Sequence, residues 1–361
     1  MIENLLDKSK NILICPLNWG LGHACRIIPI IEYCIDNNKN IILAGNGSSL
    51  KLLKHRFPTL KNEYISAPIL SYSKNQSIGF RFYFSFFRLF VNIFRERRYL
   101  NVLIKKHNID TIISDNRPGI SSPRVKSIYI THQINVFYSD KSDIFSRVLT
   151  KLHLRIIKKY TYCFVPDYAD NSIAGKLSKN TTGLNLIYLG PLSRFLTSGS
   201  VIDSIKPQYK IVCIVSGLEP QRTVFEELLL KKFKNEQNKV LILRGLPKNK
   251  NTILHVGNID LIDHCDDSFF VSSLLTCELI ICRSGYSTIM DLMTIGRKAI
   301  LVPTPGQPEQ EYLGNYLKNK GFVCLKQNEI INFDVTSIDL STCSANEKYE
   351  INLKNVLDLY L

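Results

Sequence analysis

Short runs of apolar residues alternate along the chain with longer stretches in which apolar residues recur at helical spacing. Apolar runs of about four to eight residues, bounded by turn residues, are typical of strands buried on both faces of a parallel sheet. Their alternation with helices predicts a doubly wound α/β sheet. In the first half, the predicted strands cover 11–16, 41–44, 110–114, 127–130 and 162–166. The helix predicted at 23–36 contains Pro29, so we expect a kink or a late restart there.

The same alternation begins again in the second half, which predicts a second sheet of the same kind. Its strands are expected at 210–217, 240–245, 279–282 and 298–303. The segment between the two series is rich in Ser, Gly and Pro, which is typical of a linker. We therefore predict two Rossmann-like domains, at 1–190 and 208–345, joined by a linker at 191–207. Residues 346–361 have apolar positions at helical spacing and are expected to form a C-terminal helix.

The residues after the strand predicted at 279–282 form the most informative motif in the chain. A strand that runs through Ser284 and Gly285 into a helix aims backbone N–H groups and the positive end of the helix dipole at one point, which suits a diphosphate. Ser284, Thr288 and Asp291 share one helix face, at i, i+4 and i+7. Asp291 lies roughly 10 Å beyond the turn, within reach of ribose hydroxyls. The motif indicates a nucleotide-diphosphate site, and the alternative is an ordinary polar helix start.

Further residues of the second half are candidates to contact the same ligand. Ser216 and Gly217 follow a predicted strand and can offer further backbone N–H groups to a diphosphate. Arg222 and Arg283 are candidates to neutralise the negative charge of a departing nucleotide. The sequence contains no Asp-x-Asp motif, and the pair Asp266-Asp267 alone is a weak metal signal. We therefore expect no metal and no cofactor other than the bound nucleotide.

These motifs resemble the donor half of GT-B glycosyltransferases. The similar segments are Cys282 to Asp291, Gly296, the run at 299–303 and Pro308-Glu309-Gln310-Glu311-Tyr312. Near the start, Asn18-Trp19-Gly20-Leu21-Gly22-His23 resembles the glycine-rich loop ending in Gly-His of the peptidoglycan N-acetylglucosaminyltransferase type, which uses a UDP-sugar. The resemblance spans most of the chain. It implies two Rossmann-like domains that face a cleft, with a last helix that crosses back to the first domain.

The resemblance also implies roles for individual residues. It places His23 near the acceptor, as a general base or as a hydrogen-bond donor to the acceptor phosphate. A neutral imidazole can take a proton from an attacking hydroxyl near pH 7, whereas the alternative is a histidine that only caps its helix turn. Gly20 and Gly22 permit close backbone approach to an anion. The resemblance places Glu309 and Gln310 on hydroxyls of the donor sugar.

Polar residues follow two other predicted strands of the first half. Asp115, Asn116 and Arg117 come after the strand at 110–114, and His132 comes after the next one. The carboxyl ends of parallel strands are where ligands bind in open α/β sheets. Asp115 is therefore an alternative base, and Arg117 and His132 are candidates to bind anionic groups of the acceptor beside Asn116. As ordinary turns, these residues would need no function.

Composition and charge narrow the class of protein. The 361 residues allow two domains with substantial cores, and 45% hydrophobic residues argue against disorder. A formal net charge of +15 indicates an anionic partner, such as nucleic acid, anionic lipid or a diphosphate substrate. The 10 cysteines lack C-x-x-C spacing, so we expect reduced thiols in the cytoplasm and no zinc site. The polar N-terminus is not typical of a signal peptide, and no run has the roughly 20 apolar residues that span a bilayer.

The stretch from Gly79 to Arg98 combines dense aromatic residues with arginines. One interpretation is a helix in the membrane interface, with Phe86, Phe87 and Phe90 embedded and Arg88 on lipid phosphates. The other interpretation is a core helix of the first domain with solvated arginines at its rim. Because aromatic residues occupy nearly every side of this helix, we favour partial exposure and contact with an anionic membrane.

Together, these features predict an inverting, metal-independent glycosyltransferase at the cytoplasmic face of the inner membrane. The expected donor is a nucleoside-diphosphate sugar, namely a UDP-sugar. The expected acceptor is a lipid-linked molecule or a cell-envelope glycan. A second hypothesis keeps the fold but makes the protein a nucleotide-sugar epimerase or hydrolase. A third is a non-catalytic basic protein that binds nucleic acid or membrane. No nucleic-acid module is identifiable in the sequence, so we do not expect a nucleic-acid partner.

Overall fold

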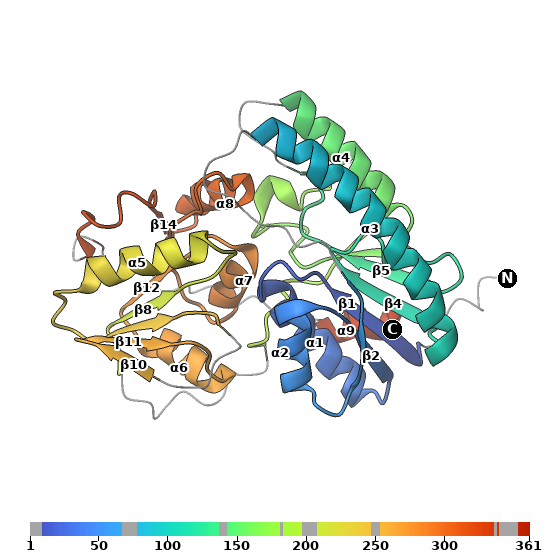
Figure 1. Ribbon diagram of the computed structural model, residues 1–361, viewed down its shortest axis with the longest axis horizontal. Helices are drawn as coiled ribbons and strands as arrows, with labels where there is room; N and C mark the ends of the chain where they lie inside the picture. The colour runs from blue at the N-terminus through green and yellow to red at the C-terminus, as the bar shows by residue number, and fades with distance from the viewer. Residues whose placement is uncertain are drawn as a thin grey trace. The chain divides into compact units, whose positions relative to one another are not determined.

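The computed structural model describes residues 9–66, 78–136, 143–180, 183–196, 208–246, 253–335, 338 and 353–361. Within these ranges, the side chains of residues 78–92, 143 and 145 are not described. The chain forms two compact units (Figure 1). Unit 1 comprises Met1–Leu70, Asn75–Leu192 and Glu350–Leu361, and unit 2 comprises Ser71–Lys74 and Ser193–Tyr349. Each unit contains one sheet with helices packed on it, which confirms the predicted fold class of two Rossmann-like α/β domains.

The sheet of unit 1 has seven strands in the order β3-β2-β1-β4-β5-β6-β7, and all its pairs are parallel. The strands are β1 (Asn11–Pro16), β2 (Asn40–Gly45), β3 (Lys61–Tyr64), β4 (Thr111–Asp115), β5 (Lys126–Ile130), β6 (Tyr162–Val165) and β7 (Leu186–Tyr188). The helices are α1 (Gly22–Asp36), α2 (Gly47–Arg56), α3 (Ile78–His107) and α4 (Asp143–Ile157), with a 3₁₀ turn at Gly175–Leu177. Leu100 and Leu103 of α3 pack against Leu13, Ile42 and Ile112 of the sheet, all of them buried.

The C-terminal helix α9 (Leu353–Tyr360) packs on unit 1. The backbone N–H of Ser9 donates to the carbonyl of Leu361 at 2.9 Å, and Lys126 Nζ donates to the carbonyl of Tyr360 at 3.1 Å. The ring of Tyr360 also meets the rings of Tyr162 and Phe164 edge-on. The end of the chain therefore belongs to the packing of the first unit.

The sheet of unit 2 has the order β10-β11-β9-β8-β12-β13-β14. Its pairs are parallel except for β10 with β11, which is an antiparallel hairpin. The strands are β8 (Ile211–Ile214), β9 (Val240–Leu243), β10 (Ile253–Val256), β11 (Ile259–Ile262), β12 (Leu279–Cys282), β13 (Ile300–Leu301) and β14 (Val323–Cys324). The helices are α5 (Gln221–Phe233), α6 (Asp267–Thr276), α7 (Tyr286–Thr294) and α8 (Pro308–Lys318). Phe225, Leu229 and Phe233 of α5 are buried in its main core cluster.

In each sheet, successive strands are first added toward one edge and then, from one point on, toward the opposite edge. In unit 1 this point lies between β1 and β4, and in unit 2 it lies between β8 and β12. The loops at the carboxyl ends of such a strand pair diverge, and open α/β sheets bind their ligands in the crevice that results. Four of the motifs, which contain Gly20, Asp115, Ser216 and Ser284, follow these four strands, so the topology places two of them at each switch point.

Several elements differ from the sequence-based expectations. The edge strands β3, β7, β10 and β14 were not predicted, because each has at most four residues and is partly or wholly exposed, so none shows a long buried apolar run. The buried strand β11, which forms a hairpin with β10, was not predicted either. Pro29 lies inside α1, which continues from Gly22 to Asp36 without a break. In the part of the chain that the structure describes, no helix is both long and apolar enough to cross a membrane.

Candidate functional site

In unit 2, the start of α7 offers an open helix N-terminus at the switch point. Gly285 is the N-cap of α7, and no side chain caps this end of the helix. The N–H groups of the first helical turn have no intrahelical acceptor, so they are available to a ligand. A Cβ built on Gly285 would meet no atom within 4 Å, so the space in front of the turn is open. An open, uncapped helix start of this kind suits an anion.

Arg283 lies just before this turn and holds three loops together. Its Nη1 donates to the carbonyls of Val302 and Pro303, both at 3.2 Å, and its Nη2 donates to the carbonyl of Gln221 at 3.1 Å and to Gln327 Oε1 at 2.7 Å. The guanidinium also lies over the ring of Phe225, 4.0 Å from its centroid. All of these acceptors are neutral, and burial lowers the pKa of Arg283 to about 10. Among the described residues, no carboxylate pairs with this buried cation.

The start of α8 is tied to the start of α7. Ser284 Oγ donates to the backbone carbonyl of Gln310 at 2.7 Å, and the backbone N–H of Thr304 donates to Gln310 Oε1 at 2.8 Å. Ser284 and Gln310 are both buried. Thr288 and Glu309, each one turn or less into its helix, are only half-buried. The Ser284 and Gln310 contacts therefore fix the helix starts, while the half-buried side chains remain nearer to the solvent.

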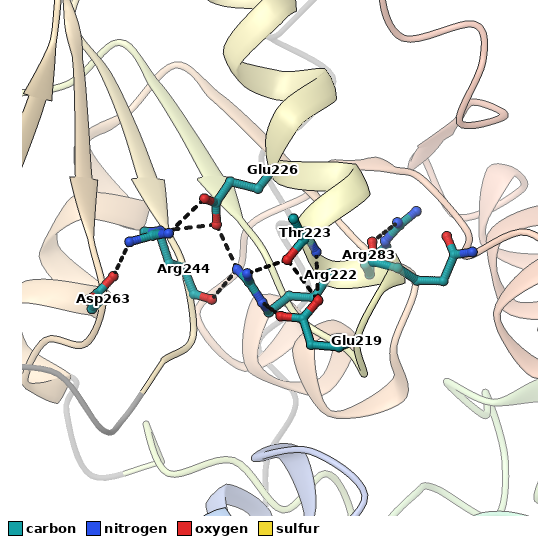
Figure 2. A network of polar contacts seen from close by, with 8 residues as sticks. Glu219, Arg222, Thr223, Glu226, Arg244, Asp263 and Arg283 are labelled. Carbon is teal, nitrogen blue, oxygen red and sulfur yellow. Dashed lines mark hydrogen bonds and ion pairs between the residues drawn. The ribbon is translucent and has the colours of Figure 1, made fainter. Parts of the chain in front are cut away.

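A chain of alternating charges runs along the same edge of the unit 2 sheet (Figure 2). Arg222 Nε donates to Glu219 Oε1 at 2.5 Å, and Arg222 Nη1 donates to Glu226 Oε2 at 2.6 Å. Arg244 Nη2 continues the chain to Glu226 Oε1 at 2.9 Å, and Arg244 Nη1 reaches Asp263 Oδ1 at 2.5 Å. Figure 2 shows Arg222 between the two glutamates, so its guanidinium is enclosed by carboxylates.

In unit 1, His23 and Asp115 meet at the switch point between β1 and β4. His23 lies in the first turn of α1, and its Nδ1 is 3.2 Å from Asp115 Oδ2 at the end of β4. Burial lowers the pKa of His23 below its usual 6.5, although the charge of Asp115 acts in the opposite direction. Because a carboxylate can only accept here, Nδ1 of His23 carries the proton, and its Nε2 keeps a lone pair. The imidazole is therefore neutral near pH 7 and oriented by a carboxylate.

Arg26, one turn after His23 on α1, holds that carboxylate from the other side. Its Nε donates to Asp115 Oδ2 at 2.8 Å, and its Nη2 contacts Asp115 Oδ1. Its Nη1 lies 3.2 Å from Nδ1 of His132, which follows β5. Burial raises the pKa of Asp115, but the charges of Arg26 and His23 outweigh this effect and hold it at about 2. Four charged or titratable groups thus form one cluster, in which Arg26, Asp115 and His132 are buried and His23 is half-buried.

The neighbouring loop after β4 presents Asn116. Its backbone is left-handed, with φ of 54°, which asparagine tolerates better than most residues. Its Oδ1 accepts a hydrogen bond from the hydroxyl of Tyr129 at 3.0 Å. With the carbonyl end of the amide occupied, the Nδ2 end is turned away from Tyr129 as a hydrogen-bond donor.

Comparisons with known proteins agree on the fold. Residues 214–348 match the family model described as glycosyltransferase family 28 C-terminal domain. The structure of Acinetobacter baumannii MurG is similar with a TM-score of 0.53 and 10% sequence identity, covering 97% of this chain and 98% of that one. The calicheamicin glycosyltransferase CalG4 is similar with a TM-score of 0.59 and 11% identity, covering 90% of this chain and 87% of that one. The chain has the GT-B fold of glycosyltransferases.

Sequence relatives point to one type within this fold. The chain is 27% identical over 148 residues to the UDP-N-acetylglucosamine–N-acetylmuramyl-(pentapeptide) pyrophosphoryl-undecaprenol N-acetylglucosamine transferase of Alkaliphilus metalliredigens, which is 38% of this chain and 40% of the relative. The match with this chain therefore spans about two fifths of the length of that relative. The protein of the same name from Francisella philomiragia is 20% identical over 342 residues, or 90% of this chain and 86% of the relative. The predicted resemblance to this GT-B type is thus confirmed.

The side chain of Asp291 makes contacts other than the expected ones. Its carboxylate was predicted to contact ribose hydroxyls, but Asp291 is buried and its Oδ1 accepts a hydrogen bond from Ser193 Oγ at 2.6 Å. Its Oδ2 is 3.9 Å from Nε of Arg194. Burial raises the pKa of Asp291 to about 6 despite these partners. The carboxylate anchors the segment that enters unit 2, and the ribose prediction is not supported.

The predicted roles of three other charged residues also need correction. Arg222 was expected to neutralise the leaving nucleotide, but Glu219 and Glu226 already occupy its guanidinium. Arg283 was expected to do the same, but its guanidinium points to neutral oxygens that hold the loops, so it acts on an anion only at a distance. Asp115 was an alternative base, but it is fully buried and its low pKa leaves it no basicity near pH 7.

Arg117 is a further correction in unit 1. It was predicted to bind anionic acceptor groups, but it is buried and its Nη2 donates to Glu96 Oε1 at 2.6 Å. Its other bonds go to Cys15 Sγ at 3.2 Å and to the carbonyls of Ile65 and Ser66. Arg117 therefore joins β1, β4 and α3 inside the unit, which is a structural role.

The remaining predicted residues have mixed positions. Gly20 is left-handed with φ of 94°, Gly217 is left-handed with φ of 111°, and a Cβ on either would meet nothing within 4 Å. Gly22 is the first residue of α1, and Ser216 follows β8, each at its switch point. Phe86, Phe87, Phe90 and Arg88 lie within α3, but their side chains are outside the described residues. The membrane prediction for these four residues therefore stays a prediction.

Sequence reasoning missed Arg26, although the sequence carries a signal for it. Arg26 is a charge inside an otherwise apolar stretch, Ala24 to Ile31, and it lies three residues after His23 on the same helix face. A buried charge in such a stretch needs a partner, and Asp115 is that partner. Ser193 and Arg194 carried no such signal, because they lie in a Ser- and Pro-rich segment that is typical of a linker. In the described part of the chain, no three His, Cys, Asp or Glu side chains are grouped to hold a metal ion.

Proposed function

We propose that this protein is an inverting glycosyltransferase that transfers a sugar from a nucleoside-diphosphate sugar to a membrane-associated or cell-envelope acceptor. The observation that carries the proposal is the open, uncapped start of α7 at the unit 2 switch point, inside the segment that matches the family 28 C-terminal domain. The relatives reported above are named for a UDP-linked donor and a pyrophosphoryl-undecaprenol acceptor. A UDP-sugar is therefore the proposed donor.

The charges of unit 2 support a diphosphate at this position. The helix dipole of α7 places partial positive charge at Gly285, and Arg283 adds a full positive charge that no described carboxylate neutralises. Gly217 and Ser216, across the switch point, are open to the solvent side and offer further backbone N–H groups. Such fixed positive groups stabilise the negative charge that develops on a departing diphosphate. This supports a transfer that needs no metal.

The His23–Asp115 pair supplies the proposed base. In the reaction, an acceptor hydroxyl oxygen bonds to the anomeric carbon while the bond from that carbon to the diphosphate oxygen breaks. The hydroxyl proton passes to Nε2 of His23, and the nucleoside diphosphate leaves with the bonding electron pair. Attack opposite to the leaving group inverts the anomeric carbon. Asp115 keeps the imidazole oriented and stabilises the imidazolium that forms, which is the usual task of such a carboxylate.

An anionic membrane is the proposed setting for the acceptor. Along the described half of α3, Phe94 (70% exposed) and Val102 (56% exposed) share a face with Arg98. On α4, Ile144 (79% exposed) and Val148 (47% exposed) share a face with basic residues at helical spacing. Exposed apolar side chains flanked by cations are typical of helices that lie in a membrane interface. A location at the cytoplasmic face of a membrane follows from this proposal and from the lipid-linked acceptor named for the relatives.

Two measurements test the proposal without knowledge of the acceptor. A thermal-shift screen of UDP, dTDP, GDP and ADP should show stabilisation by UDP, because a ligand that binds only the folded state raises its melting temperature. A coupled assay for UDP release should then give turnover with UDP-N-acetylglucosamine only when a polyprenyl-pyrophosphate-linked glycan is added. UDP release at the full rate without acceptor would favour the hydrolase or epimerase hypothesis. No stabilisation by any nucleotide would contradict the donor site itself.

A further inference from the structure

The cluster around Arg26 contains two histidines whose neutral rings carry their protons on different nitrogens. His23 Nδ1 faces Asp115 Oδ2 at 3.2 Å, and a carboxylate accepts, so the proton of neutral His23 is on Nδ1. His132 Nδ1 faces Arg26 Nη1 at 3.2 Å. A guanidinium has donors but no acceptor, so Nδ1 of His132 must be the unprotonated nitrogen. The proton of neutral His132 is therefore on Nε2.

The two imidazoles consequently offer opposite chemistry. His23 has its lone pair on Nε2 and can act as a base. His132 has its N–H on Nε2 and can act as a hydrogen-bond donor, for instance to an anionic oxygen. Both assignments depend on Arg26, because this one side chain binds both oxygens of Asp115 and also contacts His132. Arg26 is 2% exposed and Asp115 is 0% exposed, so solvent screens these contacts very little.

We propose that Arg26 is a positioning residue that fixes the tautomers of His23 and His132, so that one serves as base and the other as a neutral hydrogen-bond donor. The proposal rests on the proposed function for the role of His23 in transfer. The assignment of the protons rests on the geometry alone. The bidentate guanidinium is essential to it, because a lysine ammonium in the same place could not hold both carboxylate oxygens and reach His132 as well.

The charges that surround His23 determine how this arrangement responds to pH. The groups that face it are Asp115 from β4, Arg26 from its own helix and His132 from the loop after β5. Asp115 favours the imidazolium, whereas Arg26 and a protonated His132 disfavour it. Loss of the Arg26 charge leaves Asp115 without its strongest counter-charge. The pKa of His23 should then rise.

The tautomers can be measured directly in the full-length protein. Histidine-selective ¹⁵N labelling with long-range ¹H–¹⁵N correlation distinguishes Nδ1–H from Nε2–H, and His23→Gln and His132→Gln identify the two spin systems among the seven histidines. We expect Nδ1–H for His23 and Nε2–H for His132 near pH 7. A proton on Nδ1 of His132 in the wild-type protein would overturn the proposal. This readout needs neither donor nor acceptor, so it stands even if the proposed reaction is wrong.

Variants at Arg26 then test its control over both rings. In Arg26→Met, we expect His132 to populate both tautomers and the pKa of His23 to rise. If UDP-sugar turnover is measurable, the acidic limb of the kcat/KM profile should move up with it, by about tenfold in rate at low pH for each pKa unit. Arg26→Lys keeps the charge, so the pKa of His23 should change less than in Arg26→Met, while His132 should still populate both tautomers. Arg124→Met is the matched control, because Arg124 is exposed just before β5, at the other end of the strands.

The variants also define what would contradict the proposal. Unchanged tautomers and an unchanged pKa of His23 in Arg26→Met, at an unchanged melting temperature, would show that Arg26 is only structural. If Arg26→Met does not fold, Arg26→Lys decides the question, because it retains a buried cation next to Asp115. Identical histidine spectra in Arg26→Lys and the wild type would then overturn the proposal.

Discussion

Ser193 donates a hydrogen bond of 2.6 Å to the carboxylate of Asp291 within unit 2. Ser193 is the first residue of the main segment of unit 2, and Asp291 lies in α7, the helix whose start forms the proposed diphosphate site. The next residue, Arg194, pairs with Asp267 at 2.8 Å and lies over the rings of Phe195 and Phe270. The acid of the donor motif therefore fixes the entering chain to α7, and a change at Asp291 affects the local fold before it affects any ligand.

The raised pKa of Asp291 predicts a specific dependence of stability on pH. Burial holds the folded pKa at about 6, above the ordinary 3.8, so the folded state binds a proton more readily than the unfolded state between these values. The contribution of this group is thus most favourable below pH 4 and is lost as the pH rises through 6. The shift corresponds to at most about 3 kcal/mol.

Asp291→Asn removes this titration. We therefore expect the wild type to lose stability relative to the variant as the pH rises. The measurement is the free energy of unfolding of both proteins, obtained by urea titration from pH 4 to 7. Ser193→Ala is the companion variant and should cost about 1–2 kcal/mol, because it leaves a buried acceptor without its donor. A difference that does not vary with pH would show that Asp291 has an ordinary pKa in the folded protein.

Gly285→Ala tests the diphosphate position with little effect on the fold. The backbone of Gly285 has φ of −76° and ψ of 134°, which any residue adopts, and the added Cβ meets no atom within 4 Å. We therefore expect an unchanged melting temperature. The methyl group would occupy the space in front of the α7 N–H groups, so UDP should bind about tenfold more weakly by calorimetry. Unchanged affinity would place the diphosphate elsewhere.

The sequence predicted the parts of this fold that depend on local patterns. The buried strands on either side of both switch points were predicted because their apolar runs are continuous, as in Asn11–Pro16 and Leu279–Cys282. The positions of Gly285 and His23 followed from the same strand-to-helix transitions. What could not be predicted was which charges face one another across the fold. Arg117 and Arg222 resemble ligand-binding residues in sequence, and only their three-dimensional contacts with Glu96 and Glu226 show that they are internal.

Arg222→Met separates a structural role from a role in nucleotide binding. The variant removes the Arg222 contact of Glu219, whose Oε2 still accepts hydrogen bonds from Thr223, and removes one of the two arginines that bind Glu226. Because Glu226 keeps its bond to Arg244 and Glu219 is half exposed, the loss of these charged hydrogen bonds should cost about 1.5–3 kcal/mol of stability. The affinity for UDP should change less than about threefold, because the guanidinium is not available to a ligand. Lys231→Met, an exposed change on the same helix, is the control. A variant of normal stability with much weaker UDP binding would restore the original prediction.

The C-terminal helix should support unit 1 and not unit 2. Leu357 is 0% exposed, whereas Leu359, two residues later on the same helix, is 67% exposed. Leu357→Ala should cost about 2–5 kcal/mol, and Leu359→Ala should stay within about 0.5 kcal/mol. Hydrogen exchange should accelerate in the unit 1 strands of the Leu357 variant, with the strands of unit 2 unchanged. Faster exchange confined to unit 2 would contradict the packing of α9 on unit 1.

His23→Gln tests the proposed base. Glutamine keeps a polar side chain of similar reach but cannot accept the hydroxyl proton, so kcat should fall by about 10²–10⁴-fold. The melting temperature shift by UDP should be retained, because the nucleotide contacts proposed here lie in unit 2. His55→Gln, an exposed change on α2, is the control.

The pH profile of the wild type is a second readout of the same base. The pKa of His23 is lowered from its usual 6.5, so the acidic limb of the kcat/KM profile should lie below pH 6.5. Because protonation removes the lone pair on Nε2, activity should decline only as the pH falls through this lowered pKa. A His23→Gln enzyme with near-normal kcat and an unaltered pH profile would mean that another group takes the proton.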